Sequence, residues 1–195
     1  MSRKKRLFLI SLVLAAPLIT TVAVASFRPY VFLPAHQHCI KMAGMALHEY
    51  AETNQGRFPS HAEGYGNALL LIQENWWHAM TGPGYDVAAF REAQVSGRGL
   101  SEEQCGRVYV QGLNANTSGE VVVLFDKLST PGGDHSRLPA RLFMARRREV
   151  LHVDGHMDVV SDENWSAFAA GQIELLVKAG IPRAEAERLY AQVHE

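Results

Sequence analysis

Residues 151–160, LHVDGHMDVV, carry side chains that could bind a metal ion at every second position. His152, Asp154 and His156 are followed by Asp158 at the same spacing. Successive side chains of a β-strand point to opposite faces, so one straight strand would place all four on a single face. Imidazole nitrogens and carboxylate oxygens are donors that Zn²⁺ uses in proteins. A straight strand here would therefore indicate a metal site.

The dipeptide Asp154-Gly155 favours a chain reversal instead. Asp-Gly between two apolar runs is the strongest short-range signal for a β-hairpin. A two-residue turn at this dipeptide would place His152 opposite Met157, and the four side chains would no longer share one face. We therefore predict a hairpin rather than a straight metal-binding strand.

A looser metal site remains an alternative. His135, Asp154 and His156 could hold a divalent metal ion if the loop that contains His135 folds over the hairpin. The competing interpretation is structural, in which Asp154 bonds the backbone of its own turn and His135 anchors the loop by a hydrogen bond. The sequence predicts no organic cofactor.

No catalytic residue is predicted. The sequence contains no G-x-S-x-G nucleophile elbow, no phosphate-binding loop and no dinucleotide-binding fingerprint. We therefore expect a protein that is not an enzyme. The alternative is an extracytoplasmic metal-binding protein or metal-dependent hydrolase that uses His135, Asp154 and His156.

Charge is unevenly distributed along the 195 residues, although the formal net charge is only −1. Residues 3–6 are all basic, and residues 1–25 contain no acidic side chain. The remainder of the chain is mildly acidic, whereas nucleic-acid binding needs a basic surface. We therefore expect no nucleic-acid partner.

The N-terminal segment, residues 1–27, has the features of an export signal. An apolar run follows the basic residues, and small residues at Ala23 and Ala25 fit a signal-peptidase site before Ser26. The same apolar run is long enough to span a bilayer if it is not cleaved. Both alternatives place the rest of the chain outside the cytoplasm, either exported or periplasmic and tethered to the inner membrane.

The two cysteines, Cys39 and Cys105, could form one disulfide in an oxidising compartment. The alternative is a pair of unpaired buried thiols. No C-x-x-C motif is present, so neither a thioredoxin-type redox site nor a zinc ribbon is indicated.

The order of the predicted elements indicates an α+β fold. Residues 28–35 form a proline-bounded linker, an amphipathic helix follows over 36–56, and a second apolar helix is expected over 65–80. Strand-rich segments follow residue 105 and include the hairpin. Residues 162–195 are expected to form a helical C-terminal extension.

Two stretches resemble the pilin-like proteins of bacteria, a family related to type II secretion pseudopilins whose C-terminal half carries a His-x9-Asp-Gly motif. The first stretch is CIKMAGMALHEYAETNQGRFP at 39–59, which is similar to the helix of that family. The second runs from VVVLFDK through LHVDGH and is similar to its strand, loop and hairpin. The resemblance implies an amphipathic helix packed on a small antiparallel sheet within 36–161.

Individual positions follow from this resemblance. Asp126 and Lys127 match an acid-Lys pair at a strand end, His135 matches the motif histidine, and Asp154-Gly155 matches its final dipeptide. Here eighteen residues separate the histidine from the aspartate, and the prepilin cleavage signature is absent. The resemblance implies a structural or assembly protein of the bacterial envelope or secretion apparatus, with envelope or secretion proteins as partners.

Overall fold

The structure is a computed structural model that describes residues 40–131 and 145–193. Helix α2 (Ile40–Thr53) is its first element. The helix buries one stripe of small and apolar side chains at helical spacing, among them Ile40, Ala43 and Leu47. Gly44 lies in this stripe, and a Cβ atom added there would lie only 3.0 Å from the Leu151 side chain. The absence of a side chain at Gly44 therefore lets α2 lie close to the sheet, and the predicted amphipathic helix is confirmed within these bounds.

The single helix predicted over residues 65–80 does not form. The segment instead contains α3 (Tyr65–Leu69), the 3₁₀ turn η1 (Glu74–Trp76) and α4 (Trp77–Thr81). A continuous helix would pair the Ile72 carbonyl oxygen with the Trp76 N–H, but here that oxygen accepts a 2.9 Å bond from the Trp77 indole N–H. The break lets the buried apolar residues of this segment face the core from two directions.

A short helix, α5 (Ala88–Ser96), and a second 3₁₀ turn, η2 (Glu102–Gln104), lead into the sheet. The sheet contains β1 (Arg107–Tyr109), β2 (Val122–Asp126), β3 (Thr130–Pro131), β4 (Arg146–His152) and β5 (Met157–Ser161), and all its pairings are antiparallel. The order across the sheet is β1–β2–β4–β5, and the short β3 pairs with the same edge of β4 as β2 does. The predicted α+β class is confirmed.

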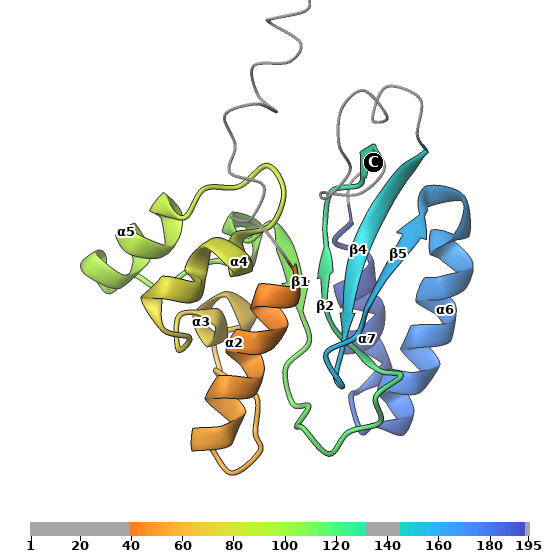
Figure 1. The fold of residues 1–195 in the computed structure, drawn as a ribbon, viewed down its shortest axis with the longest axis horizontal. Helices are drawn as coiled ribbons and strands as arrows, with labels where there is room; N and C mark the ends of the chain where they lie inside the picture. Colours follow the sequence, from red (N-terminus) through yellow and green to blue (C-terminus); the bar gives the residue numbers. More distant parts are fainter. Residues whose placement is uncertain (1–39, 132–144, 194–195) are drawn as a thin grey trace, which may run out of the picture. The chain divides into compact units, whose positions relative to one another are not determined.

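Two C-terminal helices, α6 (Asp162–Lys178) and α7 (Arg183–Tyr190), lie on the opposite side of the sheet from α2 (Figure 1). Val150 and Leu151 point to opposite faces of β4, yet they are only 0% and 1% exposed, so both faces are covered. Phe125 of β2 stacks on Tyr190 with 4.6 Å between ring centroids. The predicted C-terminal extension is helical, and its helices form part of the core of the unit Ala35–Glu195.

A buried ion pair joins the edge strand β1 to the end of β2. Arg107 of β1 and Asp126 of β2 are directly paired across the two strands, and Arg107 Nε lies 2.8 Å from Asp126 Oδ1. Arg107 also donates to the Ala79 carbonyl oxygen of α4, and the Glu149 N–H lies 3.4 Å from Asp126 Oδ2. The predicted strand-end acid Asp126 therefore joins β2 to β1 and β4 inside the core, and Arg107 extends this network to α4.

The predicted hairpin is confirmed, but its register differs from the prediction. Leu151 pairs with Met157, and the His152 N–H donates to the His156 carbonyl oxygen at 2.9 Å. The connection therefore has three residues rather than two, and Gly155 takes a positive φ of 85° at its end. This is the geometry of a turn followed by a left-handed residue, so Asp154-Gly155 lies one position later in the turn than expected.

Several predictions fall outside the described residues. These are the signal or anchor over 1–27, the linker over 28–35, Cys39 and His135, and all of them stay predictions. Cys105 is buried, and its disulfide with Cys39 likewise stays a prediction. Among the helices of the described ranges, none combines the length and the apolar character needed to cross a bilayer.

Two glycine-to-alanine substitutions should have opposite effects on stability. Gly155→Ala should lower the free energy of unfolding by about 1–2 kcal/mol, because an L-residue resists the left-handed conformation. The nearest atom to an added Cβ is His48 Nε2 at 3.8 Å, so backbone strain alone is tested. Urea denaturation of the full chain in mild detergent would measure the change.

Gly171→Ala is the matched control. Gly171 is exposed within α6, and an added Cβ would meet nothing within 4 Å. Alanine should stabilise this helix by about 0.5–1 kcal/mol. Equal effects of the two substitutions would contradict the assigned backbone conformation at Gly155.

Candidate functional site

The observed hairpin register gathers four side chains at the end of β4 and β5, named here the hairpin cluster: His152, Asp154, His156 and Asp158. His152 Nε2 and His156 Nε2 lie 3.3 Å and 3.7 Å from Asp158 Oδ2. The two imidazole rings are stacked, with centroids 3.8 Å apart and planes inclined by 14°. We predicted that a hairpin would separate these side chains. That prediction was wrong for His152, His156 and Asp158, which lie close together.

Neighbouring polar groups fix which nitrogen of His152 carries the proton. Its Nδ1 lies 3.0 Å from the Glu120 carbonyl oxygen, which can only accept a hydrogen bond, so Nδ1 must be the donor. The same oxygen accepts a 3.1 Å bond from Gln172 of α6, whose side-chain oxygen accepts from the Val122 N–H at 2.9 Å. In the neutral imidazole, Nε2 therefore carries the lone pair and faces Asp158.

Asp154 orients the second imidazole. Its Oδ1 accepts the backbone N–H of His156 at 3.0 Å and lies 2.5 Å from His156 Nδ1. These bonds lower the pKa of the Asp154 carboxyl, the backbone bond most. The carboxylate also lies against Gly119, where an added Cβ would come within 2.8 Å of Asp154 Oδ2. The prediction that Asp154 bonds its own turn backbone is confirmed.

Burial differs sharply across the hairpin cluster. His152 is only 5% exposed and its Nε2 has no hydrogen-bond partner, whereas the side chains of His156 and Asp158 are 46% and 58% exposed. Burial lowers the pKa of His152, opposed by its bond to the Glu120 carbonyl. The cluster thus presents one buried neutral imidazole beside two solvent-accessible groups.

The predicted metal-site residues are only partly brought together. Asp154 and His156 are in contact, but Asp154 supports His156, and His135 lies outside the described residues. His152 and Asp158 were missed as partners of His156. A three-residue connection, another common hairpin length, would have paired them from sequence alone.

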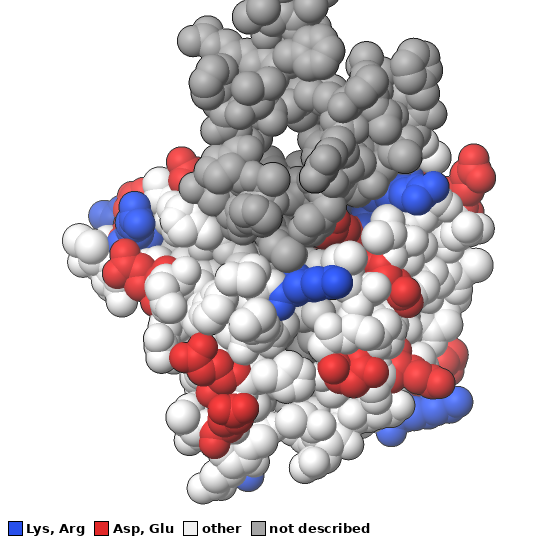
Figure 2. Space-filling view, viewed as in Figure 1, with Lys and Arg blue, Asp and Glu red and all other residues white. Residues whose placement is uncertain are grey.

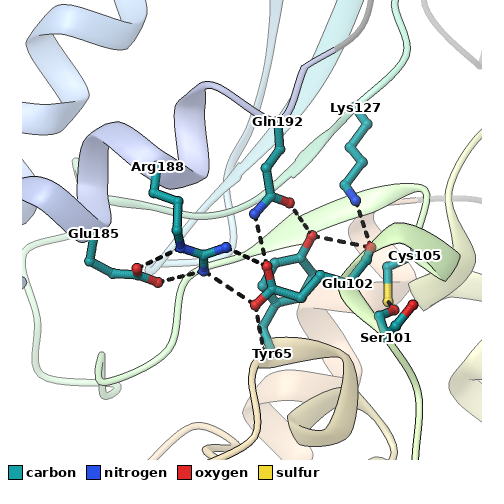
Figure 3. Close-up of polar contacts among 8 residues, drawn as sticks. All are labelled: Tyr65, Ser101, Glu102, Cys105, Lys127, Glu185, Arg188 and Gln192. Carbon is teal, nitrogen blue, oxygen red and sulfur yellow. Dashed lines mark hydrogen bonds and ion pairs between the residues drawn. The ribbon is translucent and has the colours of Figure 1, made fainter.

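A second polar cluster surrounds Glu102 of η2 and joins it to α7 (Figure 3). The Glu102 carboxylate accepts bonds from Arg188 Nη1 at 2.6 Å and from Gln192 Nε2 at 2.8 Å. Lys127 Nζ donates to the Glu102 carbonyl oxygen at 2.6 Å, and the Tyr65 hydroxyl donates to Gln192 Oε1 at 2.6 Å. These contacts link η2 to α7 and to the residue that follows it, so the cluster helps to hold α7 in place.

Comparisons with protein-family models, curated proteins and solved structures found no match.

The protonation of His152 should make stability depend on pH in the metal-free protein. Because its pKa is lowered on folding, the unfolded chain binds a proton first as the pH falls below about 6.5, and stability is lost from there downward. His152→Asn keeps an N–H donor for Glu120 and removes the titrating group. With a chelator present, urea denaturation between pH 5 and 7.5 should show a weaker loss of stability in this variant.

A second histidine, His61, provides the comparison for this experiment. His61→Asn alters an exposed imidazole outside the hairpin cluster and should leave the pH dependence as in the unmodified chain. An identical slope in the His152→Asn variant would contradict the assignment of His152 as a buried neutral imidazole.

Proposed function

We propose that the protein is an exported, pilin-like structural or assembly protein of the bacterial envelope or secretion apparatus, and not an enzyme. Its N-terminal segment, whether cleaved as a signal or kept as an anchor, would deliver the domain to the periplasm or tether it to the inner membrane. Its partners would be other envelope or secretion proteins.

The packing of α2 on the sheet is the observation that carries this proposal. Gly44 permits close approach to Leu151, and the Asp154-Gly155 reversal follows directly along the chain from the strand that α2 covers. A helix on an antiparallel sheet with this reversal is the arrangement that the pilin-like resemblance implies. Lys127 closes the end of β2 by donating to the Glu102 carbonyl oxygen, which supports a structural role for the predicted acid-Lys pair.

The outer side of α2 is the surface that we assign to partner contact. Met42 and Met45 are 36% and 58% exposed there, whereas the opposite face of the sheet is already covered by α6 and α7. On the face shown in Figure 2, the described acidic and basic side chains are interspersed among uncharged ones. This distribution supports a protein partner over a nucleic acid, which requires a basic surface.

Interrupting the apolar run of residues 7–19 should abolish export. We expect alkaline phosphatase fused after Glu195, which forms its disulfides only outside the cytoplasm, to be active with the unmodified chain. Leu9→Arg with Leu12→Arg should reduce this activity at least about tenfold, because each arginine costs about 2.5–3.5 kcal/mol at the centre of a membrane segment. Leu9→Val with Leu12→Val should keep it, and an inactive unmodified fusion would contradict export.

Assembly through α2 should be detectable by site-specific photo-crosslinking in intact cells. A photoreactive residue at Met45 should yield a crosslink to an envelope protein. Val95 of α5 is 88% exposed, more than Met45, and provides an accessible control position that should yield none. Absence of a crosslink at Met45, or equal crosslinking at both positions, would contradict an assembly surface on α2.

A further inference from the structure

We propose that His152, His156 and Asp158 form a binding site for a divalent transition-metal ion of the Zn²⁺ type, with Asp154 as the residue that orients His156. This inference goes beyond the proposed envelope role and does not depend on it. The ion would bind at the end of the β4–β5 hairpin through His152 Nε2, His156 Nε2 and an oxygen of Asp158. In the described residues these three groups place one ligand atom each within 4.8 Å of one another.

The buried nitrogen of His152 is the first observation that points to a ligand. The His152 side chain is only 5% exposed. Its Nε2 is inaccessible to water and has no hydrogen-bond partner. A buried polar atom without a partner is rare in folded proteins. In the neutral imidazole the lone pair of this nitrogen faces Asp158 Oδ2 at 3.3 Å, and a bound cation would satisfy both groups.

The second observation is that both imidazoles are hydrogen-bonded at Nδ1 as metal-binding histidines are. Histidines that bind metals almost always donate their other ring N–H to a carbonyl or carboxylate oxygen. His152 Nδ1 has the Glu120 carbonyl oxygen and His156 Nδ1 has the Asp154 carboxylate. Each ring therefore has its Nε2 lone pair available on the Asp158 side.

The spacing of each imidazole Nε2 from the Asp158 carboxylate is close to that of tetrahedral coordination. Bonds of about 2.0–2.2 Å to a tetrahedral ion place neighbouring ligand atoms about 3.3–3.5 Å apart. The two distances to Asp158 Oδ2 are 3.3 Å and 3.7 Å. The rings themselves are nearly parallel, so the His156 ring must rotate out of the stack to direct its lone pair at the same ion. Its 46% exposure leaves room for that rotation.

Two imidazoles and one carboxylate select the class of ion. Ca²⁺ and Mg²⁺ prefer sites made wholly of oxygen ligands, whereas imidazole suits Zn²⁺ and its neighbours in the transition series. Three protein ligands leave a fourth position for water or for a group from another molecule. With His156 and Asp158 both about half exposed, this fourth position faces solvent.

Ion binding would join two parts of the sheet. His152 is bonded to Glu120, which precedes β2, while Asp158 belongs to β5. A bound ion would therefore connect the start of β2 to the outer strand through the hairpin. A ligand that binds only the folded state stabilises it, by about 2.7 kcal/mol at a free concentration of 100 times its Kd.

The test is Zn²⁺ titration of the untagged full chain in mild detergent, at neutral pH and against a chromophoric chelator. We expect one equivalent to bind and to raise the thermal midpoint. Asp154→Asn should weaken Zn²⁺ affinity about 10–100-fold through loss of orientation, and His156→Gln and Asp158→Asn should weaken it by more. These three side chains are exposed, so the variants are expected to fold, which circular dichroism would check.

His61→Gln is the matched control, since it removes an exposed imidazole outside the hairpin cluster and should leave affinity unchanged. The NMR signals of the His152 and His156 side chains should shift on titration. The proposal is overturned if the unmodified chain binds no stoichiometric Zn²⁺, or if His156→Gln and His61→Gln weaken binding equally. None of these outcomes bears on export, so the two proposals fail separately.

Discussion

The register of the β4–β5 hairpin is the constraint from which the arrangement of the sheet and of the hairpin cluster follows. Side chains alternate along a strand, so a shift of one residue would exchange the two faces of β5 relative to β4. The positive φ of Gly155 closes a three-residue connection and sets Leu151 opposite Met157. This pairing directs Leu151 toward α2 and gathers His152 with His156 on the other face.

The buried charges between β1 and the end of β2 impose a second constraint. An ion taken out of water is stable in a protein only when it is paired and hydrogen-bonded. Arg107 and Asp126 meet this requirement across β1 and β2, and Arg107 also reaches the Ala79 carbonyl oxygen of α4. A shift of β1 along β2 would separate the two charges inside the core. The pair therefore favours the observed register of β1 on β2.

The sequence allowed prediction of the elements whose signals are local. The apolar spacing of α2, the strand-rich runs and the Asp-Gly reversal all rest on neighbouring residues, and the structure contains each of them. The break in the predicted helix over 65–80 depends on where the Trp77 indole finds an acceptor, which local spacing does not reveal. The hairpin cluster was also missed because its formation depends on a feature that the local sequence does not fix. Asp-Gly suits more than one hairpin length, and pairing His152 with His156 and Asp158 depends on which length forms.

The stacking of Phe125 on Tyr190 has a consequence for the order in which the protein can fold. Synthesis delivers β2 well before α6 and α7, so the aromatic surface of β2 is not fully covered until both helices have emerged. Contacts between residues so distant in the chain form late because a long loop must close first. A polypeptide that crosses a bilayer as an unfolded thread gains from this delay. On the proposal that this chain is exported, translocation would finish before the tertiary structure closes and makes the chain too wide for the channel.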